Sequence, residues 1–308
     1  MKYGQLGKTG IEVSRLCVGC LSFGQPFSDS HMWTLNPEET ETIVRKALDL
    51  GFTFFDTANT YSHGTSEEYL GRAIKNSVSR DKVILATKVY FNEGHLSKKA
   101  IQREIDGSLK RLNTDYVDLY IIHRFDRTTP IEETMEAMDG LVKCGKVRAL
   151  GASAMYGYQF YSMQVAAERN GWTKFCSMQN HYNLLYREDE REIIPLCKQE
   201  GVALTPFSPL AAGRLARVEW KSDSPRSQMD RTASQKYDGT QETDYEIVRR
   251  VHETAEKHGA TMTQVAIAWH MAKGMMAPII GATKAKYLED AAGALELSLS
   301  AEDIAYLE

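Results

Sequence analysis

Short apolar runs alternate with longer segments of helical spacing along most of the chain. One such segment carries Ile101, Ile105, Leu109 and Leu112 on a single apolar stripe, as in a helix that covers a sheet. Runs that are apolar on both faces are typical of buried parallel strands. We place eight of them at Leu16–Gly19, Phe52–Asp56, Val83–Lys88, Val117–His123, Val147–Ser153, Phe175–Asn180, Val202–Phe207 and Ala277–Gly281.

The spacing of these runs predicts a (β/α)8 TIM barrel. From the end of one run to the end of the next, the first six steps take 27 to 37 residues, and a barrel needs roughly 31 per unit. The last step takes 74 residues. It contains a polar segment near 219–243 and helical patterns at 245–258 and 263–273, which predict an inserted loop over about 211–244 and an extra helix before strand eight.

The N-terminal residues predict a separate feature. Residues 3–13 hold Gly-Lys-Thr-Gly between short apolar runs, which indicates a β-hairpin that plugs the lower end of the barrel. We expect a single domain over 1–308. A doubly wound sheet is the competing fold, but residues 18–24 lack the G-x-G-x-x-G turn that such a sheet carries after its first strand when it binds a dinucleotide.

Composition and charge narrow the partners. A net charge of −4 offers no broad basic surface for a nucleic acid, so we expect a small-molecule ligand. The chain shows neither a secretory h-region nor an apolar stretch of membrane-spanning length, and its five cysteines form no disulfide framework. We therefore expect no membrane partner and a cytoplasmic location. The oligomeric state stays open.

Polar residues close three consecutive apolar runs. Asp56, Lys88 and His123 are separated by 32 and 35 residues, one strand-plus-helix unit each, and Tyr61 follows Asp56 in the next loop. Because the carboxyl ends of parallel strands meet at one rim, we expect these side chains to converge there. Each has an ordinary structural explanation when taken singly, but their joint phasing favours a catalytic group.

Such a group suits a proton-coupled reaction on a carbonyl. We assign Tyr61 as the proton donor, with Lys88 lowering its pKa from the usual value of about 10. Asp56 would hold the ammonium of Lys88, because an unpaired buried charge is costly. His123 would donate a hydrogen bond to the carbonyl oxygen and direct it.

The motifs GFTFFDTANTYSHGTSEEYLG, ATK and IIHRFD resemble those of the aldo-keto reductase superfamily, and the similarity covers nearly the whole chain. The chain looks most like the bacterial and fungal branch with aryl-alcohol-dehydrogenase-like enzymes, which is related to potassium-channel β subunits. This resemblance implies that NADPH lies across the barrel mouth and that Asp56, Tyr61, Lys88 and His123 are the catalytic tetrad.

The resemblance also implies a cofactor site. Ser153, Gln179 and Asn180 match positions that bind the nicotinamide carboxamide, and Phe207 matches an aromatic that stacks on the nicotinamide ring. The pyrophosphate would lie along Ser208, Pro209, Leu210, Ala211 and Gly213, with added charge from Arg214. Gly281 ends the eighth strand as a further cofactor-binding position. Thr283 and Lys284, at the start of the last helix, would bind the 2′-phosphate, which favours NADPH over NADH.

Two features depart from the family pattern. Asp290-Ala291 stands where a Glu-Asn pair commonly contacts the adenine. The chain ends at Glu308, so a C-terminal loop that lines the substrate pocket in many relatives is missing or not included.

The remaining candidate residues concern the substrate and metals. Aromatic residues near the expected mouth favour aryl or apolar aldehydes, namely Phe23, Trp33, Tyr90, Phe91 and Phe125. A C-x-x-C pair at Cys17 and Cys20 has no second pair, and the histidines form no metal-binding spacing, so we expect no metal site. We assign His181 to packing beside the mouth.

The sequence therefore predicts an NADP-dependent oxidoreductase acting on CH-OH groups, which reduces aldehydes and ketones reversibly with NADPH/NADP+. The alternative is a redox-sensing nicotinamide-binding protein of the channel β-subunit type, in which turnover is incidental. A lyase or isomerase on the same barrel is a third possibility, and it predicts no spectral change with nicotinamide.

Overall fold

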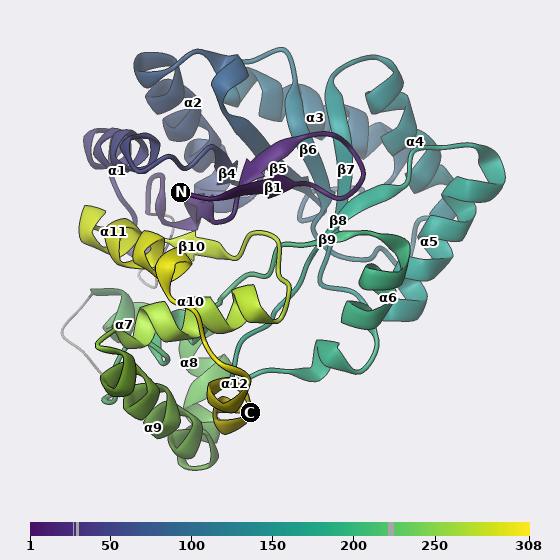
Figure 1. Cartoon of the computed structure of the whole chain (residues 1–308). Helices are drawn as coiled ribbons and strands as arrows, with labels where there is room; N and C mark the ends of the chain where they lie inside the picture. The colour runs from purple at the N-terminus through teal and green to yellow at the C-terminus, as the bar shows by residue number, and fades with distance from the viewer. Residues whose placement is uncertain (27, 29–30, 221–224) are drawn as a thin grey trace.

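A parallel barrel sheet forms the centre of the molecule (Figure 1). The computed structural model describes residues 1–26, 28, 31–220 and 225–308. Within them, eight strands pair in parallel in the order β10-β3-β4-β5-β6-β7-β8-β9. Their bounds are β3 (Cys17–Gly19), β4 (Phe54–Asp56), β5 (Ile84–Val89), β6 (Val117–Ile122), β7 (Val147–Ser153), β8 (Phe175–Gln179), β9 (Ala203–Leu204) and β10 (Ile279–Gly281). Each lies in one of the predicted apolar runs, apart from the last residue of β5.

Backbone hydrogen bonds close the sheet into a barrel, because they join the segments beside β9 and β10, the strands at its two edges. The amide of Met276 donates to the carbonyl of Leu204 at 2.7 Å, and the amide of Ile279 donates to that of Pro206 at 2.9 Å. The predicted (β/α)8 barrel is confirmed.

Helices follow the strands and cover the outside of the sheet. They are α1 (Pro37–Asp49), α2 (Thr65–Ser77), α3 (Lys98–Leu112), α4 (Ile131–Lys143), α5 (Gly157–Asn170), α6 (Ile193–Glu200), α10 (Met262–Ala272) and α11 (Ala285–Gly293). The predicted stripe of α3 faces inward, because Ile101 and Ile105 are fully buried. Ser97 caps this helix by accepting from the amide of Ala100, and Asn113 ends it in the left-handed conformation.

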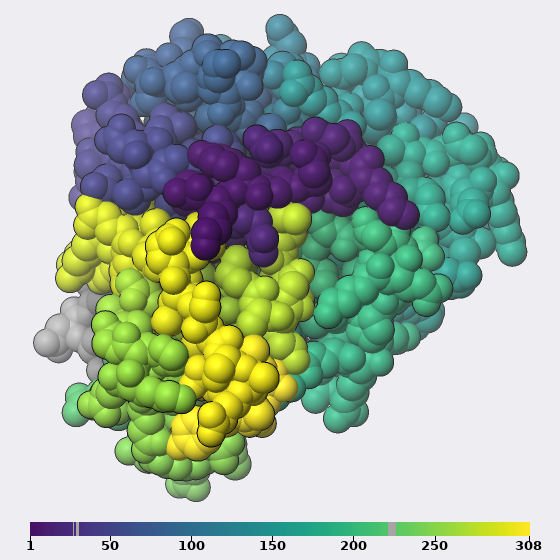
Figure 2. Space-filling view, in the orientation of Figure 1, coloured from purple at the N-terminus to yellow at the C-terminus, as the bar shows by residue number. Residues whose placement is uncertain are grey.

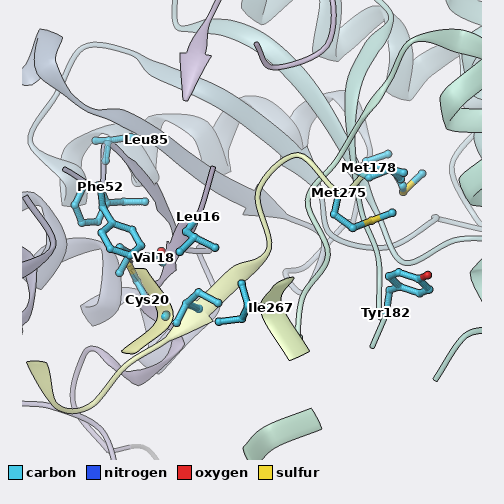
Figure 3. Close-up of a cluster of buried hydrophobic side chains, with 14 of the residues drawn as sticks. Leu16, Val18, Cys20, Phe52, Leu85, Met178, Tyr182, Ile267 and Met275 are labelled. Carbon is cyan, nitrogen blue, oxygen red and sulfur yellow. Dashed lines mark hydrogen bonds between the residues drawn. The ribbon is translucent and has the colours of Figure 1, made fainter. Parts of the chain in front are cut away.

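The alternation of side chains along the strands produces two apolar layers. Phe54 and Leu119 point into the barrel and join an inner cluster, whereas Phe55 and Leu85 point outward and join the larger cluster beneath the helices. Figure 3 shows part of the outer cluster. Polar side chains that end an inward row must therefore point into the barrel mouth.

An N-terminal hairpin covers the lower end of the barrel, as predicted. Strands β1 (Tyr3–Gln5) and β2 (Glu12–Ser14) are antiparallel. Leu6 and Val13 are fully buried and belong to the inner cluster, so they fill the barrel from below. Figure 2 shows the hairpin crossing this face of the molecule.

The segment between β9 and β10 contains more helix than the sequence predicted. The expected loop of about 211–244 holds α7 (Pro225–Met229), α8 (Arg231–Tyr237) and the start of α9 (Gln241–His258). The helix α8 lacks an apolar stripe, and its main signal is the cap Asp230, which accepts from the amide of Ala233. The last helix, α12 (Ala301–Leu307), lies beside α9, where Lys257 donates to Asp303 at 2.7 Å. No helix in the described part of the chain is both long and apolar enough to cross a membrane.

Candidate active site

Polar side chains end the inward rows of neighbouring strands. Asp56 follows Phe54 on β4, Lys88 follows Ala86 on β5, and His123 follows β6 directly. In the sheet, Gly19 pairs with Asp56 and Lys88 pairs with Ile121, so these strand ends lie at the same rim. The predicted convergence is therefore present in the geometry.

A buried ion pair between Asp56 and Lys88 lies at the bottom of the barrel mouth, and we call it the floor. The ammonium of Lys88 donates to Asp56 Oδ1 at 2.5 Å and to the carbonyl of Thr57 at 2.7 Å. The other oxygen of Asp56, Oδ2, accepts from Gln179 Nε2 at 2.9 Å. Lys88 and Asp56 are 0% and 2% exposed, so both carboxylate oxygens and the ammonium are held by protein groups away from solvent.

The phenol of Tyr61 lies against this ion pair. Lys88 Nζ donates to Tyr61 Oη at 3.2 Å and lies 4.7 Å from the centre of the ring. The chain reverses directly after this residue, because Ser62, His63 and Gly64 all have positive φ. Two of these are non-glycine residues, a strained backbone of the kind that gathers at functional sites. The strained turn fixes where the phenol points.

Burial changes the electrostatics that the sequence predicted for Tyr61. Desolvation raises the pKa of its phenol, and this outweighs the opposing effect of the Lys88 charge, so the pKa lies above its usual value. The pKa of Lys88 is also raised, since Asp56 and Tyr61 together overcome the cost of burying the ammonium. Lys88 thus lowers the pKa of Tyr61 as expected, but the effect of burial is larger. At neutral pH Tyr61 is a protonated phenol beside a fixed cation.

His123 stands beside the phenol as a neutral imidazole. Its ring lies edge-on to Tyr61 at 5.8 Å between ring centres, and edge-on to Phe91 at 5.0 Å. Burial, the charge of Lys88 and the charge of Arg124 hold the pKa of His123 well below its usual range. Its Nδ1 is buried without a described partner. A neutral imidazole here suits hydrogen-bond donation to an oxygen better than proton abstraction.

The strand ends next to the tetrad carry unsatisfied polar atoms. Ser153 Oγ and Asn180 Oδ1 are both buried without a partner among the described residues. Asn180 is oriented through its other amide atom, because Nδ2 donates to Asp189 Oδ2 at 2.5 Å. Buried polar atoms normally have partners, so these two suit a ligand amide. Gln179 has less freedom, since Nε2 is already bound to Asp56.

The ring of Phe207 lies just beyond these atoms. His181 stacks on it with 5.3 Å between ring centres and an interplanar angle of 10°, and Lys236 Nζ lies 5.2 Å from its centre. The ring is partly exposed. The packing position predicted for His181 agrees with its stacking between Phe207 and Tyr186, which lies 4.3 Å from it.

A tight turn follows β9 where the pyrophosphate is expected. Ser208, Ala211, Ala212 and Gly213 all have positive φ, while Pro209 is buried and Leu210 half-buried. The amides of Ala211 and Gly213 already donate to carbonyls within the turn. A phosphate here would therefore depend on nearby side-chain cations.

Arg214 serves partly as an anchor in this turn. Its Nη2 donates to Asp238 at 2.6 Å, it lies over the Tyr237 ring at 5.5 Å, and only 7% of the residue is exposed. Its Nε is buried without a described partner. One nitrogen of the guanidinium thus remains for a ligand.

Sequence reasoning missed other arginines at this turn. A Cβ built on Gly213 would lie 2.7 Å from Arg217 Nη2, and one built on Gly281 would lie 3.6 Å from Arg226 Nη1. Arg217 has a buried, unpartnered Nε, and Arg226 stacks over Trp33 at 4.5 Å. Neither has a motif that distinguishes it, because the fold of the insertion decides where it lies.

The end of β10 and the start of α11 present Gly281, predicted to bind the cofactor, with Thr283 and Lys284, predicted for the 2′-phosphate. Gly281 and Lys284 are exposed and Thr283 is half-buried, and Lys284 occupies the N-cap position of α11. The pair expected near the adenine is occupied differently. Asp290 accepts from Thr261 Oγ1 at 2.7 Å, and Ala291 is fully buried.

The predicted substrate aromatics fall into two groups. Phe91 is 50% exposed next to His123, while Tyr90 and Phe125 are partly buried against the outer cluster. Phe23 and Trp33 are buried, at 0% and 6% exposed. Phe23 has no accessible surface for a substrate in this structure, because it packs into the core. In the described residues no group of three or more His, Cys, Asp or Glu is arranged to hold a metal ion.

Comparisons with known proteins show which family the chain is similar to. A model of the Aldo/keto reductase family matches residues 15–308. Versiconal hemiacetal acetate reductase of Aspergillus parasiticus is 40% identical, over 100% of this chain and 96% of that protein. An aryl-alcohol-dehydrogenase-like protein of Schizosaccharomyces pombe is 41% identical, over 99% of this chain and 94% of its own. The crystal structure of the thermostable aldo-keto reductase Tm1743 with the inhibitor epalrestat has a TM-score of 0.80 and 30% identity, covering 100% of this chain and 98% of that one.

Proposed function

Because the chain belongs to the aldo/keto reductase family, we propose that it reduces aldehydes and ketones reversibly to alcohols with NADPH, and that Tyr61 is the proton donor. The contact that carries this proposal is the hydrogen bond of 3.2 Å from Lys88 Nζ to Tyr61 Oη, with Lys88 itself bound to Asp56. A phenol in contact with a fixed buried cation is suited to release a proton to a developing alkoxide.

The residues beside the tetrad fit a nicotinamide cofactor. Ser153 Oγ and Asn180 Oδ1 are unpartnered polar atoms for the carboxamide, and the partly exposed ring of Phe207 offers a stacking surface. Arg214 and Arg217 each keep a buried, unpartnered Nε near the turn assigned to the pyrophosphate. When bound, the reduced cofactor supplies the hydride that is added to the carbonyl carbon.

The protein residues then control the proton and the carbonyl oxygen. His123, held neutral by burial, donates a hydrogen bond that orients the oxygen toward Tyr61. Tyr61 transfers its proton to that oxygen, and the ammonium of Lys88 stabilises the tyrosinate that remains. Asp56 keeps Lys88 charged and in place, while Gln179 fixes the second oxygen of Asp56.

The preference for NADPH over NADH forms part of the same proposal. Lys284 is exposed directly before α11, and an amino-terminal helix end with a cation favours a phosphate. We also propose that residues 1–308 act as one barrel domain, with the insertion near 211–244 lying over the cofactor.

Enzyme assays test the proposal directly. The purified protein is incubated with NADPH and with nitrobenzaldehyde, methylglyoxal or small sugars, while the absorbance of the reduced cofactor is followed. We expect cofactor oxidation with at least one aldehyde and formation of the matching alcohol. Inactivity on every carbonyl compound would contradict the proposal, and stopped-flow release of bound cofactor that is slower than any useful turnover would instead support a nicotinamide sensor.

A further inference from the structure

Two positively charged side chains from different parts of the chain lie beside Phe91 and Phe207. Arg124 directly follows His123 at the end of β6, and Lys236 belongs to α8 in the insertion. Neither takes part in the reaction proposed above. Their position beside the reacting groups raises the question of what they bind.

Arg124 lies next to both Tyr61 and Phe91. Its guanidinium carbon is 5.6 Å from the centre of the Phe91 ring, and its Nη1 donates to the carbonyl of His123 at 2.6 Å. Its charge acts on the phenol of Tyr61, whose pKa it lowers slightly against the larger effect of burial. The guanidinium is partly buried and retains donors that the protein does not use.

Lys236 lies beside Phe207, which follows β9. The residue is exposed, yet its ammonium lies 5.2 Å from the centre of the Phe207 ring. Partial desolvation of the ammonium beside Phe207 lowers the pKa of Lys236, and the positive charge of Arg124 lowers it further. The two cations are therefore within electrostatic range of each other.

Neither of these two cations pairs with a carboxylate in the part of the chain that the structure describes. In contrast to Arg214 and Arg226, which bind Asp238 and Asp230, neither Arg124 nor Lys236 has an ion pair with a described carboxylate. Asp230 acts on Lys236 only at longer range, since its oxygens bind Arg226 and the amide of Ala233. Two neighbouring cations without a counter-ion repel each other, and a bound anion removes that cost.

The position of this pair indicates which anion. Phe91 is 50% exposed and stands between His123, 5.0 Å away, and the guanidinium of Arg124. A substrate ring on Phe91 would lie beside His123 and within reach of the guanidinium of Arg124. A planar carboxylate matches the fork of a guanidinium in two parallel hydrogen bonds.

We propose that the preferred substrates are aldehydes or ketones that carry a carboxylate, and that Arg124 and Lys236 bind this group. The inference rests on the proposed function, because it assigns the substrate class of the same site. It makes Arg124 the main determinant of the preference and Lys236 a weaker second contact.

A matched pair of substrates isolates the effect of the charge. The methyl ester of 4-carboxybenzaldehyde has the same reacting group as the free acid but no negative charge. We expect the wild-type protein to show a kcat/KM for the acid about tenfold or more above that for the ester. In Arg124→Met we expect the acid to lose about 30-fold in kcat/KM and the ester less than about fivefold, because one charge-assisted contact is removed.

Control variants separate this effect from general damage. Arg127→Met removes an exposed arginine three residues away and should keep the preference for the acid. Lys236→Met should lower the preference about threefold, with an unchanged Kd for NADPH measured by fluorescence. Thermal unfolding of each variant shows whether it is folded. The preference should also fall as ionic strength rises.

The outcomes test the carboxylate preference and the reductase function separately. Equal kcat/KM for acid and ester in the wild-type protein would overturn the carboxylate inference while the reductase function stands. An Arg124→Met variant that keeps the preference would also overturn it. If Lys236→Met weakens NADPH binding and leaves the preference intact, Lys236 belongs to the cofactor site. Inactivity on both compounds and on every other aldehyde would contradict the reductase function, and the carboxylate inference with it.

Discussion

The floor and the rim of the barrel mouth use similar polar residues but hold them in different ways. On the floor, Asp56 and Lys88 lie on strands, are almost completely buried and have protein partners for their charges. On the rim, Lys284 and Lys236 lie at or near the ends of helices and are exposed. The floor is rigid because its backbone belongs to the sheet, whereas the rim depends on how loops and inserted helices cross the mouth.

In the proposed reaction, this difference separates proton transfer from the choice of substrate. Asp56 and Lys88 are fixed by the backbone pairing of β4 with β5, and Tyr61 lies in the turn that follows β4. The residues assigned to the phosphates and to the substrate anion belong to segments that vary more readily in length and sequence. Changes on the floor should therefore abolish the reaction, while changes on the rim should alter which molecules are used.

The largest effect is expected from Tyr61, whose phenol contacts Lys88 of the floor. Tyr61→Phe removes the proton donor and leaves the ring in place, so kcat should fall by about 10³-fold or more. The Kd for NADPH should change less than about twofold, since the cofactor contacts are elsewhere. Steady-state kinetics and fluorescence titration check the two values. A variant that keeps its kcat would exclude Tyr61 as the donor and contradict the assignment of the floor.

The next effect combines activity and stability. Lys88→Met leaves Asp56 as an uncompensated buried carboxylate, which should lower the free energy of unfolding by about 3 kcal/mol or more. Denaturant unfolding measures this loss, and kcat should fall with it. Lys82→Met, at an exposed lysine before β5, is the matched control and should change stability by less than about 0.5 kcal/mol. Equal stability of the two variants would mean that the buried pair is not needed to hold the floor.

A rim substitution should change the choice of cofactor without stopping the reaction. Lys284→Ala removes a cation before α11, so the ratio of kcat/KM for NADPH over NADH should fall about tenfold. Lys286→Ala, two residues further along α11 and also exposed, should leave the ratio within about twofold of wild type. If Lys286→Ala had the larger effect, the 2′-phosphate would lie elsewhere on the rim.

The smallest effect concerns pH and the residue that orients Asn180. Burial raises the pKa of Asp189 to about 6, and the hydrogen bond from Asn180 only partly opposes this rise. The folded protein therefore binds this proton more tightly than the unfolded chain, where the pKa is about 3.9. The resulting stability is complete below about pH 4 and is lost as the pH rises through about 6.

Asp189→Asn keeps an acceptor for Asn180 and removes this titration. Relative to wild type, the variant should gain about 1 kcal/mol between pH 4 and 7, a value reduced by the partial exposure of the carboxyl. Thermal unfolding across this pH range measures the gain, with Glu68→Gln, at an exposed carboxylate on α2, as the control. A gain that does not change with pH would contradict the raised pKa.

The floor was largely predictable from the sequence. The spacing of 32 and 35 residues between Asp56, Lys88 and His123 places each at the end of a strand, and the two-residue alternation of strands turns them inward. The spacing does not show how far each side chain is removed from water, and so it does not predict the pKa values of these groups. The pKa of Tyr61 is raised because burial outweighs Lys88, and burial depends on the whole fold.

The rim was less predictable for a related reason. The segment that forms α7 and α8 is polar, so it lacks the periodic apolar stripe that identified α3. Arg226 reaches Trp33 across the mouth, and Lys236 reaches Phe207, through contacts between distant parts of the chain. For Phe23 the prediction differs in the other direction. It was expected to face the substrate because it follows the first strand, but its side chain is packed into the core.

The hairpin of β1 and β2 has a consequence for how protons return to the tetrad. Leu6 and Val13 fill one end of the barrel with fully buried apolar side chains. Under the proposed function, a proton released by Tyr61 would be replaced through the opposite opening, which the cofactor and the product would also use. Reprotonation and product departure would then share one route.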